Sequence, residues 1–153
     1  MRGLILIGLL LLAGCGAPRA DRPPEIRYGK DLCAECRMIL GDKRVAAALA
    51  DEAGEIQKFD DIGCVTMYQS KIGTAPKNFW VHDYATEEWM EGKDAFFAQA
   101  DNVITPMGYG VAAFSSRAGA QQFVEQQQGR IIPWEGMLSV LQKKGGITRE
   151  INT

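Results

Sequence analysis

The 153-residue chain has a single histidine, His82, and only four cysteines, and its basic residues do not cluster. Its 17 Lys and Arg are scattered among 19 Asp and Glu, which leaves a formal net charge of −2. Binding to nucleic-acid phosphates requires clustered Lys and Arg, so the composition argues against a nucleic-acid partner. Beyond residues 4–12 there is no long apolar run, so we expect the rest of the chain to be water-soluble.

The N-terminus has the pattern of a bacterial lipoprotein signal peptide. Arg2 supplies a positive charge, and the apolar run that follows is shorter than the roughly 20 residues needed to span a bilayer. The segment Leu12-Ala13-Gly14-Cys15 resembles a lipobox, which implies cleavage before Cys15 and lipid attachment there. The alternative is a plain secretory signal with an incidental cysteine.

We therefore divide the chain into three parts. Residues 1–14 are predicted to be the signal peptide, and residues 15–27 a lipidated N-terminus with a proline-rich tether. Residues 28–153 have the size of one compact domain. Several acyl chains on one cysteine make a stable anchor, so this domain would be held at a membrane surface.

The pattern of apolar and turn-forming residues predicts an α+β fold of two similar small halves. Asp60 or Asp61, and Ser115 or Ser116, have the side chains that begin helices. The order strand, strand, helix, strand occurs twice, in halves of about 28–92 and 93–145, and a weak internal echo pairs 63–69 with 136–142. The predicted strands cover residues 45–49, 55–59, 78–84, 95–99 and 110–114, and the predicted helices cover about 61–70, 116–128 and 134–144, the last ended by Gly145-Gly146.

The cysteines do not fit a purely structural role. With Cys15 lipidated, three remain, Cys33, Cys36 and Cys64. An odd number of cysteines in an oxidising compartment leaves at least one thiol unpaired, which favours a ligand or reactive role. The alternative for Cys64 is simple burial. With Met67 it lies on one helix face, which favours core packing for both.

The segment from Cys33 to Met38 combines soft sulfur donors at close spacing. Cys33 and Cys36 are spaced to face one centre, and Met38 adds a thioether that needs no deprotonation. Cu(I) prefers such donors, so we predict a Cu(I) site that also includes Met107 from the turn Pro106-Met107-Gly108. The alternatives are a Cys33–Cys36 disulfide and methionines that fill gaps in the core.

Other polar residues have weaker claims. His82 shares a strand face with Trp80 and Tyr84, where it either ligates copper or makes a hydrogen bond within an aromatic face. Asp60 and Asp61 are interpreted as helix-capping residues, with little support for a metal there.

The chain resembles the NosL family, lipoproteins that deliver copper for nitrous oxide reductase maturation. The usual first motif has Gly where this chain has Arg37. Behind the lipobox, the resemblance covers nearly all of the mature chain, in five segments in the family's order: Cys33-Ala34-Glu35-Cys36-Arg37-Met38, Phe59-Asp60-Asp61-Ile62-Gly63-Cys64, Trp80-Val81-His82-Asp83-Tyr84, Glu88-Trp89 and Pro106-Met107-Gly108-Tyr109-Gly110.

The resemblance implies a monomeric periplasmic Cu(I) carrier whose fold is related to the organomercury lyase core. It also implies transfer of copper to an ABC-type maturation complex and through it to nitrous oxide reductase. Carried onto this sequence, the ligands are Cys36, Met38 and Met107, followed by Cys33, with His82 as a possible nitrogen ligand. The anchor on Cys15 is compatible with either the inner or the outer membrane.

Two enzymatic functions and one non-enzymatic function are alternatives to the copper carrier. Cys33 and Cys36 could serve a thiol–disulfide oxidoreductase, although no clear strand precedes them and no clear helix follows. Cleavage of carbon–mercury bonds is discounted, because similarity of fold does not transfer function. The third alternative is a structural lipoprotein that binds no metal.

Overall fold

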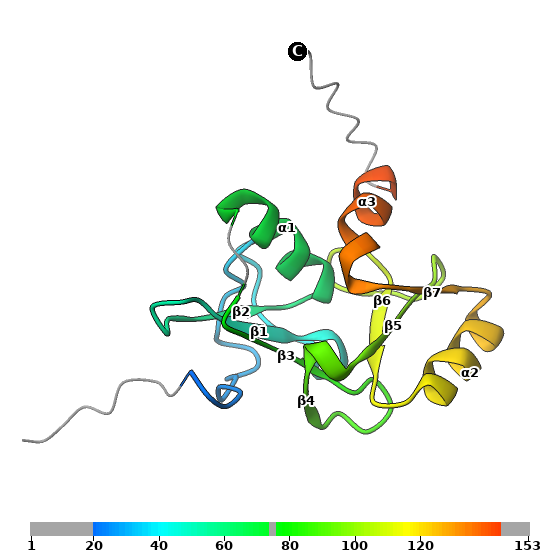
Figure 1. Ribbon diagram of the computed structural model, residues 1–153, viewed down its shortest axis with the longest axis horizontal. Coiled ribbons are helices and arrows are strands. Elements are labelled where there is room, and N and C mark those ends of the chain that lie inside the picture. The colour runs from blue at the N-terminus through cyan, green and yellow to red at the C-terminus, as the bar shows by residue number, and fades with distance from the viewer. Residues whose placement is uncertain (1–19, 74–75, 145–153) are drawn as a thin grey trace, which may run out of the picture.

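Two antiparallel sheets lie side by side in the computed structural model, which describes residues 20–73 and 76–144 (Figure 1). The predicted signal peptide, Cys15 and the Gly145-Gly146 helix stop lie outside the described residues. Within the described part, none of the helices has the length and apolar character that a membrane span requires.

The first sheet has four strands in the order β2-β1-β3-β4. Its strands are β1 (Ala47–Ala50), β2 (Ile56–Phe59), β3 (Asn78–His82) and β4 (Trp89–Glu91), and helix α1 (Ile62–Ile72) connects β2 to β3. A short 3-10 helix, η1 (Lys43–Val45), precedes β1 and replaces the start of the strand predicted from residue 45.

The second sheet has three strands in the order β6-β5-β7. Another 3-10 helix, η2 (Gly92–Asp94), leads into it. The remaining elements are β5 (Phe96–Gln99), β6 (Val111–Phe114), α2 (Arg117–Gln127), β7 (Arg130–Ile132) and α3 (Trp134–Lys144).

The predicted repeat of strand, strand, helix, strand is confirmed. The sheet orders β2-β1-β3 and β6-β5-β7 correspond element by element, and α1 and α2 each connect the second strand to the third. The sequence similarity between residues 63–69 and 136–142 does not reflect this repeat, because it pairs α1 with α3. Helix α3 follows β7 and has no counterpart in the first half. Strand β4 was not predicted, and the repeated order implied β7 without giving its bounds, since three residues carry too little periodicity.

Capping side chains begin the two equivalent helices as expected. The side chain of Asp61 accepts a hydrogen bond from the Gly63 amide (2.9 Å), and that of Ser116 accepts one from the Gly119 amide (3.1 Å). Helix α1 ends at Gly73, whose left-handed φ of 71° suits glycine.

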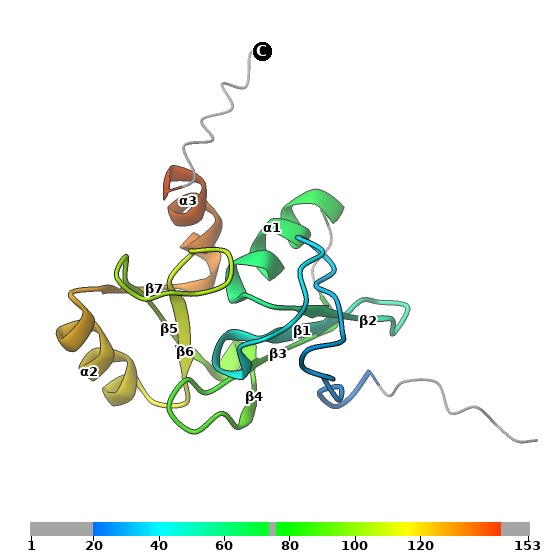
Figure 2. The same cartoon turned by 180° about the vertical axis from the view of Figure 1, so that it is seen from behind.

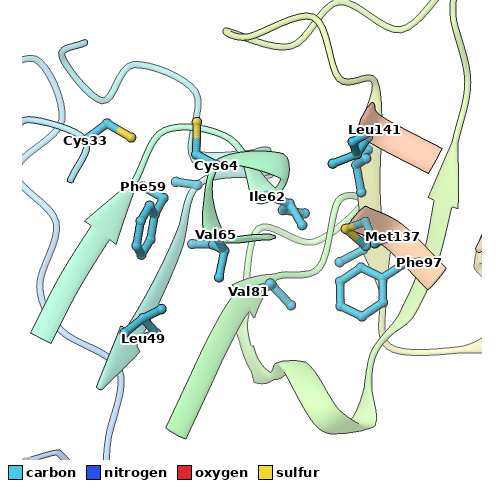
Figure 3. Packing of buried hydrophobic residues seen from close by; sticks show 14 of the residues in the cluster. Cys33, Leu49, Phe59, Ile62, Cys64, Val65, Val81, Phe97, Met137 and Leu141 are labelled. Atoms are coloured by element: carbon cyan, nitrogen blue, oxygen red, sulfur yellow. The ribbon is translucent and has the colours of Figure 1, made fainter. Parts of the chain in front are cut away.

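The main core lies where α1 and α3 pack together over the sheets, on one side of the molecule (Figures 1 and 2). Figure 3 shows Met137 and Leu141 of α3 facing Ile62 of α1 across the cluster. The Thr66 hydroxyl donates to the Met137 sulfur at 3.3 Å. Full burial of a Met or Leu side chain contributes about 1.5–3 kcal/mol, so α3 stabilises the first half as well as the second.

Asp83 joins the two sheets at their adjacent ends. One carboxylate oxygen accepts from the Ser115 amide (2.7 Å), and the other accepts from the amides of Ala85 (2.9 Å) and Thr86 (3.0 Å). Burial alone would raise the pKa of Asp83, but these hydrogen bonds outweigh it and lower the pKa to about 2. Beside them the Tyr84 amide donates to Ala113 O (2.8 Å).

We predict that Asp83→Asn lowers the free energy of unfolding by about 1–3 kcal/mol at pH 7, because the amide cannot replace a charged acceptor of three donors. The folded pKa is below the unfolded one, so the contribution of Asp83 is complete above roughly pH 4 and is lost as the pH falls toward 2. The variant should therefore lose less stability than the wild type between pH 5 and pH 3. Urea unfolding at each pH measures both effects.

The matched control is Asp94→Asn, which changes an exposed carboxylate in η2. It should leave the free energy of unfolding unchanged at neutral pH. Equal acid sensitivity of wild type and Asp83→Asn would contradict the assignment.

Candidate metal site

Residues 33–38 form a closed loop along the outer edge of β2. The Cys33 amide donates to Met38 O (2.8 Å), which closes the loop on itself. The Ala34 amide donates to Lys58 O (2.8 Å), which holds the loop against the edge strand. Local hydrogen bonds to the backbone therefore fix the position of both loop cysteines.

Arg37 occupies the left-handed region of backbone space, with φ of 67°. Its amide donates to Cys33 O (3.1 Å), so the conformation belongs to the loop closure. Glycine adopts this φ without steric cost, whereas a residue with a Cβ does not. Arg37 stands where the usual motif has Gly, and it therefore carries a conformational cost that glycine would avoid.

Three thiols and a carboxylate gather between this loop and the start of α1. The sulfurs of Cys33, Cys36 and Cys64 and a carboxylate oxygen of Asp60 all lie within 4.8 Å of one another. Cys33, Cys64 and Asp60 have no exposed surface, while Cys36 is half-buried. In Figure 3 the Cys33 sulfur points toward Cys64. All three cysteines are free thiols, so the Cys33–Cys36 disulfide alternative is not what the structure contains.

Asp60 is the common hydrogen-bond acceptor of the cluster. The Cys36 thiol lies 3.3 and 3.4 Å from its two oxygens, and the Cys64 thiol lies 3.5 Å from one of them. The Cys36 amide points at the Cys33 sulfur (3.5 Å). Two thiols thus satisfy the buried Asp60 carboxylate as hydrogen-bond donors. A metal that binds the two sulfurs would replace the protons of these hydrogen bonds.

The three thiols differ in acidity. The interaction between the Cys33 and Cys64 side chains lowers the pKa of Cys33 and, together with burial, raises that of Cys64, so Cys33 is the more acidic of the pair. Burial raises the pKa of Cys36 to about 12, and the neighbouring Cys33 and Asp60 add to the effect. The accessible thiol is therefore protonated at neutral pH in the absence of a metal.

Asp61, next in the chain, turns toward the second half of the molecule. Its carboxylate has no exposed surface and accepts from the Thr105 hydroxyl (2.6 Å) and the Met107 amide (3.1 Å), in addition to the Gly63 amide. Burial raises the pKa of Asp61 even though these donors lower it. Because the Tyr109 ring lies against Gly63, where a Cβ would come within 2.2 Å of it, the Met107 loop is packed onto the start of α1.

Both predicted methionine ligands are accessible. Met38 is 45% exposed and Met107 is 38% exposed, so the alternative that they fill gaps in the core is wrong. Met38 follows Cys36 by two residues on the loop. The Met107 amide donates to the carboxylate of Asp61, which is next to Asp60 in the chain. Two exposed thioethers therefore lie on loops that border the thiol cluster.

His82 lies outside the cluster. Its Nδ1 donates to Ala46 O (3.1 Å), and its ring packs on Trp89 with centroids 3.7 Å apart. It ends β3 while Asp60 follows β2, and the intervening strand β1 separates their backbones by about 10 Å. The arrangement fits the aromatic-face alternative, and a ligand role for His82 stays a prediction.

Sequence reasoning missed Asp60 and Cys64 as members of the cluster. Cys64 is buried in the core, as predicted, but its sulfur also faces the other two thiols. Asp61 caps α1, whereas Asp60 does not and is left to bind thiols. The spacing of Asp60 and Cys64, four residues apart across a helix start, was the available signal.

We predict that Arg37→Gly raises the free energy of unfolding by about 0.5–1 kcal/mol. Relief of the left-handed conformation gains about 1–2 kcal/mol, and the greater freedom of unfolded glycine costs part of it. Urea unfolding measures the difference. Arg37→Ala is the control, since it removes the same charge but keeps the Cβ. An equal gain in both variants would show that the backbone conformation is not the cause.

Comparisons with known proteins give the family of this chain and a structure of similar fold. The sequence profile of the NosL family matches residues 26–139. The crystal structure of the copper chaperone NosL from Shewanella denitrificans is similar in fold, with a TM-score of 0.67 and 17% sequence identity over 77% of this chain and 96% of that chain. Curated proteins gave no significant match. Since the family profile covers most of the described residues, this chain belongs to the NosL family.

Proposed function

We propose that this protein is a membrane-anchored periplasmic Cu(I) chaperone that supplies copper for assembly of the copper centres of nitrous oxide reductase. The observation that carries the proposal is the position of Cys36. Of the three described cysteines it alone is not fully buried, and it lies on a loop with the exposed Met38 and beside the loop of Met107. The fold shared with a copper chaperone and the NosL membership support the same function.

The proposed mechanism is ligand exchange. Cu(I) is soft and accepts low coordination numbers, so one thiolate from Cys36 and two thioethers from Met38 and Met107 suffice to hold it. As the Cu–S bond forms, the Cys36 proton leaves to solvent, and the free energy of that bond outweighs the cost of deprotonation that the raised pKa of Cys36 imposes. Because both methionines are exposed, a sulfur or imidazole of the acceptor can enter as the chaperone's ligands leave.

The lipid predicted on Cys15 would place this exchange at a membrane. Anchoring confines carrier and acceptor to one surface and raises their effective concentration. The resemblance to the family implies an ABC-type maturation complex as the acceptor, with nitrous oxide reductase as the final client. Delivery in this scheme requires contact between partners rather than catalysis by the chain.

A thiol–disulfide oxidoreductase is less well supported. Such a site uses an accessible thiol of low pKa at the start of a helix. Here no α-helix begins in residues 33–46 of the described chain, where the first helical element is the 3-10 helix η1, and burial raises the pKa of the accessible Cys36 to about 12. The more acidic Cys33 has no exposed surface to meet a substrate.

The decisive experiment is an anaerobic Cu(I) competition titration against a chromophoric chelator. We expect one tightly bound Cu(I), lost in Cys36→Ser and weakened about tenfold or more in Met38→Ala and Met107→Ala, since each removes one soft ligand. Met90→Ala is the matched control: this half-buried methionine lies in β4, at the opposite edge of the sheet from the loop, and its loss should leave the affinity unchanged. Absence of Cu(I) binding by the reduced protein would sink the proposal.

Delivery is tested separately in a denitrifying bacterium that lacks its own copy of the gene. We expect the copper content of its nitrous oxide reductase to be restored by the wild-type chain, to stay low with Cys36→Ser, and to be only partly restored with Cys15→Ala. The last variant keeps the metal ligands but loses the anchor and its effective concentration. Full copper content in cells without any copy of the gene would contradict the assigned client.

A further inference from the structure

The described chain begins on the face of the first sheet that α1 does not cover. Ala20 packs against a small apolar cluster that includes Ala48 and Trp80. The Asn78 side chain donates a hydrogen bond to the carbonyl of Ala20. Because side chains alternate between the two faces of a strand, Leu49 lies on the opposite face, in the core with α1. In both Figure 1 and Figure 2 the start of the described chain, in blue, lies across the strands from α1.

Lys58 of β2 holds the next part of the chain in place. Its Nζ donates to Glu25 O and to the Asp31 carboxylate, both at 2.6 Å. The hydrogen bonds from Lys58 and Arg27 hold the pKa of Asp31 well below its usual range, so this carboxylate is charged at neutral pH. The chain is therefore fixed to the domain from Ala20 onward, and only the residues before Ala20 separate the domain from the predicted anchor.

The connection to the anchor is short compared with the domain. Five peptide units join Cys15 to Ala20. A fully extended chain spans at most about 3.6 Å per residue, so the lipid-bearing residue lies within about 18 Å of Ala20. A compact domain of this length has a diameter of about 35 Å, and a path over half of its circumference is about 55 Å long. The tether is therefore too short to reach around to the side of α1.

The copper-donor loops lie at the other face and the other end of this sheet. A Cβ on Gly54 would lie 3.5 Å from that of Ala20, so Ala20 is at the end where β2 begins. Asp60 follows the other end of β2, and the four residues of the strand span about 10–13 Å. The thiols gather at Asp60 beside α1, and the Met107 loop is bonded to Asp61 there. Both donor loops are therefore remote from the point at which the tether leaves.

We propose that the anchor on Cys15 turns this face of the first sheet, at its Gly54 end, toward the bilayer and holds the Cys36 and Met107 loops away from it. The orientation rests on the lipidation of Cys15 that is part of the proposed function. Copper is then exchanged with a part of the acceptor that extends beyond the membrane by most of the thickness of the domain. An acceptor site at the level of the lipid headgroups does not fit this geometry.

The test uses the lipidated, isotope-labelled mature protein in vesicles of phosphatidylethanolamine and phosphatidylglycerol that contain a gadolinium-chelating lipid. The paramagnetic ion broadens the NMR signals of amides that lie close to the bilayer. We expect a several-fold greater loss of amide signal at Gly54 and Lys77, which lie near Ala20, than at Met38 and Met107. Cys15→Ala, which carries no lipid, is the control and should show little broadening of either pair.

A second variant tests whether tether length is the cause. Insertion of twelve Gly and Ser residues between Ala17 and Pro18 raises the maximum reach to about 60 Å, enough to pass around the domain. We expect the two pairs of amides to become nearly equal in broadening, while the affinity for Cu(I) stays unchanged. Full asymmetry that persists in the insertion variant would contradict the role of the tether.

The remaining outcomes separate the orientation from the copper function. Equal broadening of both pairs with the native tether, or stronger broadening at the two methionines, overturns the orientation. A mass spectrum without lipid on Cys15 overturns it together with its premise, and the Cu(I) titration of the same protein still reports on the chaperone function. The expected asymmetry in a protein that binds no Cu(I) would uphold the orientation and overturn the chaperone.

Discussion

The buried carboxylate of Asp61 is the contact on which the arrangement of the site depends. It caps α1 in the first half and accepts hydrogen bonds from Thr105 and Met107 in the second. Since it has no exposed surface, removal of its partners would leave a buried charge unsatisfied at a cost of about 1–3 kcal/mol or more. The cost of separating the two loops therefore falls on the same residue that begins the helix, which favours the Met107 loop in its place beside α1.

Asp60 and Asp61 are adjacent in the chain but serve opposite sides of this arrangement. Asp61 faces the Met107 loop, and Asp60 faces the thiols of Cys36 and Cys64. Because consecutive residues in an extended segment point in opposite directions, one short segment between β2 and α1 sets the position of both donor loops. The distance between the Cys36 loop and the Met107 loop is thus fixed by covalent geometry and two carboxylates rather than by a large interface.

Local sequence patterns were sufficient where an element is long enough to carry its own period. They predicted the three helices and five of the strands, with the repeated order of the two halves. Strands β4 and β7 exist because β3 and β5 offer them pairing edges, which is tertiary information. In the site, burial and ligand capacity were treated as exclusive for Cys64, and the structure combines them. The sequence could not distinguish Asp60 from Asp61 as the cap of α1, because that depends on the residue at which the first turn of the helix begins.

The half-buried position of Cys36 connects affinity to release. A closed set of buried thiolates would bind a soft ion tightly and surrender it slowly, because no incoming ligand could reach the metal. A set made only of exposed thioethers would exchange readily but bind weakly. Cys36 lies between these extremes: it is half-buried, and it lies beside the buried Cys33, Cys64 and Asp60 as well as the loop surface. Its thiol is held by Asp60 and its pKa is raised by burial, so without a metal it stays protonated. Thiolates rather than thiols attack disulfides, so a Cys36 thiol that is held protonated is less reactive toward them until a metal replaces the proton.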